Sequence, residues 1–320
     1  MGYVHSESVT DSEGCFGAVF HARQKKDGQS PRHICVKVIN RGSHPIFNQS
    51  DMTAMLQKEV EIQYRVRHQN LVELYDVYAD AGLVYMFVEL CSKGDLLSLL
   101  EKVGTFDQSS ARRYFRQIIY GLMYLHRHNI IHGDLKCENI LVDANDTVKI
   151  SDFGFSEHYK PDAKSKMRGT AVYMAPEIAQ GQQYDYSVDM WASGVVLYMM
   201  LTGELPHRPQ KSASGIEPSN GRGETWMGGF DSKMAHSATN AGLLSRLQDP
   251  NVQISEGGNV SPEACDLLWC LLDKDPKTRI KSADVEDHPW FRGVPMHVFY
   301  RWHELDKDTA SLPMSDCTAV

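Results

Sequence analysis

The sequence predicts an α+β fold, in which a strand-rich N-terminal part with one main helix is followed by a mostly α-helical part. Residues 34–39 form an apolar strand interrupted by one lysine, and residues 71–78 and 83–88 indicate two paired strands around a turn. Residues 107–128 have apolar side chains at helical spacing, and residues 187–201 are apolar enough for a buried helix.

The remaining elements follow the same two patterns. Residues 13–19 place small residues in a turn between two strands, where the backbone can approach a ligand closely. Residues 52–66 have the spacing of a helix, and residues 140–150 indicate a short hairpin. Residues 261–272 and 282–291 are expected to complete the helical part.

Lys37 is the lysine inside the apolar strand at residues 34–39. A charged side chain that faces the interior costs free energy unless it is paired, so a lysine there needs an acidic partner. The alternative is an outward-facing lysine on an edge strand.

Four polar residues with suggestive spacing lie within residues 131–154. Asp134, Lys136 and Asn139 can converge only if a tight loop folds them to one side, and Asp152 follows the next apolar strand. Asp134 could then accept the proton of an attacking hydroxyl, and Lys136 could neutralise a migrating phosphoryl group. The oxygens of Asn139 and Asp152 are ligands that Mg²⁺ accepts. This set is suited to phosphoryl transfer.

Composition narrows the class of protein. With 320 residues, of which 42% are apolar and 23% charged, the chain can form one large domain or two lobes, and wholesale disorder is not expected. The net charge of −8 argues against general affinity for nucleic acid. No stretch approaches 18 apolar residues, so stable membrane insertion is not expected. The seven cysteines contain no C-x-x-C pair, which favours a reducing, cytoplasmic location, with the nucleus also open.

Over residues 4–292 the chain resembles a eukaryotic protein kinase domain of the serine/threonine type. The resemblance depends on the order of the motifs, which is a glycine-containing loop, Lys37, a catalytic loop, a D-F-G segment and an A-P-E segment. It implies a bilobal fold with an N-lobe at 1–89, a hinge at 90–93, a C-lobe at 94–292 and a tail at 293–320. Residues 208–240, which are rich in Ser and Gly, would be an insert in the C-lobe.

The resemblance also implies roles for individual residues, with ATP and Mg²⁺ as cofactors. The catalytic set would be Asp134, Lys136, Asn139, Lys37, Glu59 and Thr170, with Asn139 and Asp152 as metal ligands. The nucleotide would be bound by Ser12, Gly14, Gly17, Val19, Cys35, Lys37, Val88, Glu89, Cys91, Asp95, Leu141, Ser151 and Asp152. Glu59 is preferred to Glu61 as the partner of Lys37, because of its spacing from residues 68–70. For Asp95 the alternative role is to cap the following helix.

Two further pairs support this arrangement. Asp189, in the apolar helix, would bond the backbone of the catalytic loop. Arg279 would pair with Glu177, and since either charge buried alone is unfavourable, the two positions support each other.

One position departs from the family, because Gly133 stands where most members have an arginine. That arginine usually pairs with a phosphorylated residue of the activation loop. We therefore expect activity to depend little on phosphorylation of Ser165 or its neighbours. Gly133 together with Ser12 leaves open a different class of protein, a pseudokinase-like interaction scaffold.

Partners are predicted less directly. Glu138 and Asp95 match acidic positions that contact substrate arginines in related kinases, so protein substrates that are basic around the target Ser or Thr are expected. Plain solvation of Glu138 and ribose binding by Asp95 are the alternatives. The insert at 208–240, which contains Trp226, or the tail would bind a regulator. Local motifs are similar to aurora-type, testis-specific, checkpoint and calmodulin-dependent kinases, which leaves the subfamily unresolved.

Overall fold

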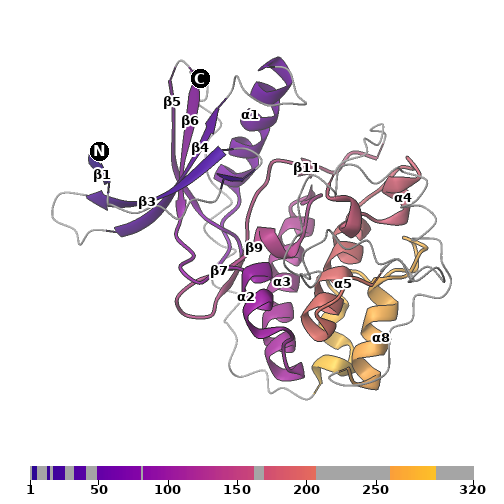
Figure 1. The fold of residues 1–320 in the computed structure, drawn as a ribbon. Helices are drawn as coiled ribbons and strands as arrows, with labels where there is room; N and C mark the ends of the chain where they lie inside the picture. Colours follow the sequence, from indigo (N-terminus) through magenta and orange to yellow (C-terminus); the bar gives the residue numbers. More distant parts are fainter. Residues whose placement is uncertain are drawn as a thin grey trace, which may run out of the picture.

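A computed structural model describes eight segments of the chain, which are residues 2–5, 13–14, 17–25, 32–40, 49–80, 82–161, 169–206 and 260–292. The predicted insert at 208–240, the tail at 293–320 and positions Ser12 and Ser165 lie outside these residues. The described segments form two parts. One part is an antiparallel sheet with helix α1, in the upper half of Figure 1, and the other is mainly helical and lies below it. The predicted α+β, bilobal class is confirmed.

The sheet has the strand order β1-β3-β4-β6-β5, with β2 paired to β3, and every pairing is antiparallel. Its strands are β1 (Gly2–His5), β2 (Glu13–Gly14), β3 (Gly17–Lys25), β4 (Arg32–Asn40), β5 (Leu74–Ala79) and β6 (Leu83–Glu89). Strand β4, which carries Lys37, pairs with β3 on one side and β6 on the other. Lys37 is therefore not on an edge strand, and that alternative is wrong.

Alternation along β4 decides which side chains face helix α1 (Gln49–Arg65). Ile34 and Val36 pack with Ala22 on one face of the sheet. Ile39 packs with Leu56 of α1 on the other. Because successive side chains of a strand point to opposite faces, Lys37 shares the α1 face with Ile39.

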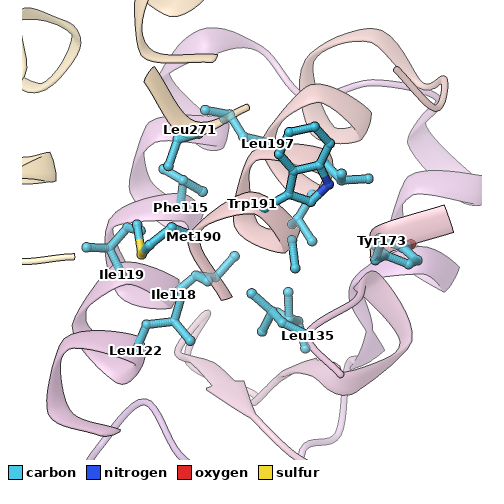
Figure 2. Packing of buried hydrophobic residues seen from close by; sticks show 14 of the residues in the cluster. Phe115, Ile118, Ile119, Leu122, Leu135, Tyr173, Met190, Trp191, Leu197 and Leu271 are labelled. Atoms are coloured by element: carbon cyan, nitrogen blue, oxygen red, sulfur yellow. The ribbon is translucent and has the colours of Figure 1, made fainter. Parts of the chain in front are cut away.

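The helical part surrounds the largest core of the described residues. Its helices are α2 (Leu96–Val103), α3 (Gln108–Arg127), α4 (Pro176–Ala179), α5 (Ser187–Thr202) and α8 (Pro262–Leu271). Figure 2 shows Phe115 and Ile118 of α3 packing towards Trp191 and Leu197 of α5 and Leu271 of α8. Helix α5 is buried along almost its whole length, as its apolar sequence predicts. Within the described residues, no helix has the length and apolar character needed to cross a membrane.

The rest of the described chain after the sheet forms short strands and 3₁₀ turns. They are β7 (Gly94–Asp95), β8 (Ile130–Ile131), β9 (Ile140–Val142), β10 (Val148–Ile150), β11 (Glu157–His158) and the 3₁₀ turns η1 (Cys137–Asn139), η2 (Ala171–Tyr173), η3 (Val285–Asp287) and η4 (Pro289–Phe291). The predicted hairpin at 140–150 is the pair β9–β10. The segment 282–291, expected to be helical, instead forms two 3₁₀ turns. Pro289 explains the break, because a proline disfavours helical geometry in the residue before it, and His288 is extended.

A buried ion pair joins α4 to the segment that follows α8. Arg279 donates from Nη1 to Oε1 of Glu177 at 2.6 Å and from Nη2 to Oε2 at 3.1 Å. The exposed fractions of the two side chains are 0% and 2%. Arg279 also donates to the carbonyl oxygens of Ser187 and Asp273. The predicted pair is confirmed, and its donors are satisfied on three sides.

We expect Arg279→Met to lower the free energy of unfolding by about 3–5 kcal/mol, because it leaves the Glu177 carboxylate buried without its cation. Urea unfolding followed by circular dichroism measures this loss. Arg65→Met is the matched control, since the exposed pair of Arg65 with Glu61 on α1 should contribute no more than about 0.5 kcal/mol. Equal losses in the two variants would contradict the prediction.

Candidate active site

The loop between β8 and β9 brings four of the predicted residues together. Oδ1 of Asp134 accepts hydrogen bonds from the backbone N–H and the hydroxyl of Thr170, both at 2.8 Å. Nζ of Lys136 lies 2.9 Å from Oδ2 of Asp134 and donates to the Thr170 hydroxyl at 2.9 Å. Asn139 closes the loop by donating from Nδ2 to the Asp134 carbonyl at 2.8 Å. A carboxylate, a cation and a hydroxyl therefore meet at one point.

The side chain of Asp189, on α5, holds this loop in place. Its carboxylate accepts from the backbone N–H groups of His132 and Gly133, both at 2.9 Å, and lies 3.0 Å from Nε2 of His126. Burial disfavours ionisation of Asp189, but the hydrogen bonds and charge of His126 and the other donors keep its pKa below the usual value. The predicted bond from this residue to the loop backbone is present.

A second cluster forms where the sheet meets the helical part. Nζ of Lys37 lies 2.9 Å from Oε1 of Glu59 on α1 and 3.2 Å from Oδ1 of Asp152. The neighbouring candidate Glu61 instead contacts Arg65 on the surface of α1. Helical geometry separates the two glutamates, since residues two positions apart do not share a face. Glu59 is thus the partner of Lys37.

The charges of Lys37 and Asp152 stabilise each other, whereas burial raises the pKa of Glu59 above its usual value. Burial favours the neutral form of Lys37, but Asp152 and Glu59 outweigh it and raise the pKa of Lys37 above its usual value. Burial also opposes ionisation of Asp152, yet Lys37 and, less strongly, Lys136 hold the pKa of Asp152 below its usual value. Lys37 is therefore protonated and Asp152 ionised at neutral pH.

The donor set fits a magnesium ion. Asn139 uses its amide nitrogen to bond Asp134, which leaves the amide oxygen as its acceptor atom. Asp152 is an ionised carboxylate at a left-handed backbone position, with φ of 64°. Carboxylate and amide oxygens are hard ligands of the kind that Mg²⁺ prefers.

The predicted nucleotide-binding residues are distributed over the adjoining strands. Gly14 of β2 pairs with Gly17 of β3, and Val19 pairs with Lys37 across β3 and β4. Cys35 pairs with Val88 across β4 and β6, at the end of β6 before the predicted hinge. Strands β3 and β6 both pair with β4, the strand that carries Lys37.

The side chains of Cys35 and Cys91 in this region are thiols, not thiolates, at neutral pH. Burial raises the pKa of Cys35 to about 11, an effect that Lys37 opposes, and burial followed by the charge of Glu89 raises the pKa of Cys91 to about 12. Both are free cysteines. They contribute apolar surface and not charge at neutral pH.

Three further predicted residues have local bonding partners. Asp95 caps α2, because its carboxylate accepts from the backbone N–H and hydroxyl of Ser98, both at 2.8 Å. Asp95 also pairs with Leu141 across β7 and β9. Ser151 donates from its hydroxyl to the Asn139 carbonyl at 3.0 Å. The capping role anticipated as the alternative for Asp95 is thus the one its contacts display.

Lys149 is a residue of this site that sequence reasoning missed. Its side chain is 8% exposed, lies 2.9 Å from Oε1 of Glu89, and donates to the Gln69 carbonyl at 2.7 Å. It therefore connects β10 of the helical part with the end of β6 and the loop after α1. The available signal was the one used for Lys37, a single lysine within an apolar strand.

Comparisons with known proteins agree with this geometry. The sequence model of the family described as "Protein kinase domain" matches residues 12–291. The chain is 33% identical over 278 residues to an aurora kinase of Yarrowia lipolytica, covering 87% of this chain and 66% of the relative. It is 30% identical over 278 residues to an aurora kinase of Schizosaccharomyces pombe, with coverages of 87% and 68%. The chain thus spans about two thirds of the length of these two relatives.

A third relative belongs to another branch. The chain is 31% identical over 291 residues to the serine/threonine-protein kinase PLK4 of Nematostella vectensis, covering 90% of this chain and 26% of that protein. Because kinases of two groups match at similar identity, the subfamily stays unassigned. The motif order, the two-part fold and these matches lead to one conclusion: the chain belongs to the protein kinase family, in its serine/threonine class.

Proposed function

We propose that the protein transfers the γ-phosphoryl group of ATP, with Mg²⁺, to serine and threonine hydroxyls of other proteins. The observation that carries the proposal is the assembly of two charged clusters in one chain, Asp134 with Lys136 and Lys37 with Glu59 and Asp152. Phosphoryl transfer needs positioning and charge neutralisation rather than a covalent intermediate on the protein.

Asp134 is the proposed acceptor of the substrate proton. Its Oδ1 atom already accepts from the Thr170 hydroxyl, so a hydroxyl in a similar place would donate to the same oxygen. Lys136 is within 2.9 Å of both groups and can stabilise negative charge that develops on a phosphoryl oxygen. Asp189 holds the backbone of the loop so that these side chains keep their relative positions.

Lys37 is the proposed ligand of the ATP phosphates, positioned by Glu59. Asp152 and Asn139 would hold Mg²⁺, while the turn at Gly14 and Gly17 would cover the phosphates. Mg-ATP supplies the transferable phosphoryl group and a counter-charge for its oxygens. Lys37 keeps its proton next to this site, so it presents a fixed positive charge to the phosphates.

The adenine is proposed to lie against the end of β6. Val19, Cys35, Val88 and Leu141 would provide apolar contacts, and the backbones of Glu89 and Cys91 would bond its edge. Strand β6 ends at Glu89 and β7 begins at Gly94, which supports a hinge at 90–93 between an N-lobe at 1–89 and a C-lobe at 94–292. The ion pair of Glu89 with Lys149 would hold the start of this hinge, at the end of β6, against β10.

Basic residues around the target hydroxyl are the proposed substrate preference. Glu138 follows Lys136 closely, and burial raises its pKa above the usual value. A substrate guanidinium next to Glu138 would favour its ionised form, so binding and ionisation would reinforce each other. Asp95 gives less support to this preference, because its carboxylate caps α2.

Independence from activation-loop phosphorylation is also proposed. Gly133 has no side chain that could pair with a phosphate, and its φ of 78° is in the left-handed region. A Cβ added there would lie 3.1 Å from the Phe155 carbonyl oxygen. Gly133 is therefore adapted to its backbone position as well as lacking the cation. The insert at 208–240 and the tail remain the proposed sites for a regulator, and the five described free cysteines support a reducing, cytoplasmic location.

Asp134→Asn is expected to lower kcat by about 10²–10⁴-fold, because the amide cannot accept the substrate proton. Transfer of labelled phosphate from ATP to a generic basic protein measures kcat, and the thermal shift caused by Mg-ATP should persist. Glu61→Gln, on the exposed face of α1, is the control with unchanged kcat. Activity that survives in the Asp134 variant would refute the assignment.

Phosphatase treatment and Ser165→Ala are both expected to leave kcat unchanged. The physical reason is the missing cation at position 133, without which a phosphate in the loop has no partner there. The initial rate of phosphoryl transfer before and after treatment, with dephosphorylation checked by mass spectrometry, tests this. A large loss that both treatments share would show that the proposal is wrong.

Gly133→Ala is expected to lower the free energy of unfolding by about 1–2 kcal/mol, the cost of a left-handed backbone for a residue with a Cβ. Gly82→Ala is the control, because nothing lies within 4 Å of a Cβ there and its φ is not left-handed. Urea unfolding of both variants gives the comparison. Equal stabilities would mean that Gly133 is not required by the backbone.

A further inference from the structure

Helix α1 has a second charged anchor next to Glu59. Lys58, the preceding residue, points its ammonium group to strand β11, where Nζ lies 3.5 Å from Oε2 of Glu157. The two neighbouring side chains therefore reach in different directions. Glu59 contacts Lys37 in the sheet, while Lys58 contacts the beginning of the segment that follows Asp152. Figure 1 shows β11 next to α1 at the junction of the two parts.

Glu157 is itself fixed to the helical part by two contacts. Its other carboxylate oxygen, Oε1, accepts from the Tyr184 hydroxyl at 2.8 Å. Tyr184 lies between α4 and α5 and packs against the large core of the helical part. The backbone of Glu157 pairs with Ile131, directly before the catalytic loop. The carboxylate is thus held by elements that do not belong to α1.

From these contacts we propose that Glu157 is a positioning residue, a permanent negative charge that holds α1 where Glu59 can reach Lys37. This inference rests on the proposed phosphoryl transfer, whose regulation it concerns. Because Gly133 cannot pair with a phosphate, a phosphorylated loop would have no anchor at that position. A carboxylate encoded in the sequence supplies a negative charge on this segment without modification.

The size of the effect follows from exposure. The Lys58 and Glu157 side chains are 36% and 29% exposed, so their attraction is partly screened. A pair of this kind shifts a two-state equilibrium of α1 by about twofold to fivefold. That is enough to modulate kcat and too little to decide whether the protein folds.

A charge-reversal cycle tests the bridge on phosphatase-treated protein. Lys58→Glu and Glu157→Lys should each lower kcat about twofold to fivefold and speed hydrogen exchange of the amides in α1, since each places like charges together. The double variant should recover part of both losses, because it restores an opposite pair while leaving the Tyr184 hydroxyl without its carboxylate. Lys102→Glu is the matched control, an equal charge change on the exposed face of α2 away from α1, and should leave both readouts unchanged.

Two results would overturn the proposal: single variants that match the wild type in kcat and exchange, or a double variant whose losses equal the sum of the single ones. Where a reversal variant fails to fold, Glu157→Gln and Tyr184→Phe remove the charge and the hydroxyl separately, and should raise α1 exchange. A wild-type protein without any phosphoryl transfer would refute the proposed function, while exchange in α1 would still decide whether the bridge exists.

Discussion

The carboxylate of Asp189 is the constraint on which the catalytic region depends. It is 1% exposed, and a buried charge is tolerated only where donors surround it. Besides His126, its partners are the backbone N–H groups of His132 and Gly133, so the loop cannot leave helix α5 without removing two of the donors that this buried charge needs. Helix α5 is itself buried in the largest core of the described residues. The packing of α5 therefore fixes Asp189, and Asp189 in turn fixes the loop that carries Asp134 and Asn139.

Three ion pairs among the described residues join the sheet and helix α1 to the helical part. Lys149 with Glu89, which ties β10 to the end of β6, is more enclosed than Lys37 with Asp152, because the exposed fractions are 8% and 22% in the first pair and 22% and 25% in the second. The bridge at Glu157 is more exposed and correspondingly weaker. The most exposed of the three pairs, Lys58 with Glu157, is therefore the one that breaks at the lowest cost.

Gly133 combines two properties that the sequence alone does not separate. The absence of a side chain removes a cation, and the left-handed backbone at φ of 78° gives a reason for glycine at this point. The carbonyl of Gly133 would in turn be only 2.8 Å from a Cβ at Gly169, so the catalytic loop and the segment before Thr170 pack backbone against backbone. This close backbone contact is uncharged, and Gly133 offers no cation for a phosphate to bind.

Local patterns in the sequence were sufficient for the α+β class, the apolar strand around Lys37 and the loop that gathers Asp134 and Asn139, because alternation, helical spacing and loop length act over a few residues. Long-range contacts were decided only by the tertiary structure. These include the central position of β4 and the burial of Lys149. The apolar spacing of residues 282–291 also did not predict the break before Pro289, because such spacing carries no information on backbone geometry. A pattern gives the face that a side chain occupies, and only packing gives the partner that it meets there.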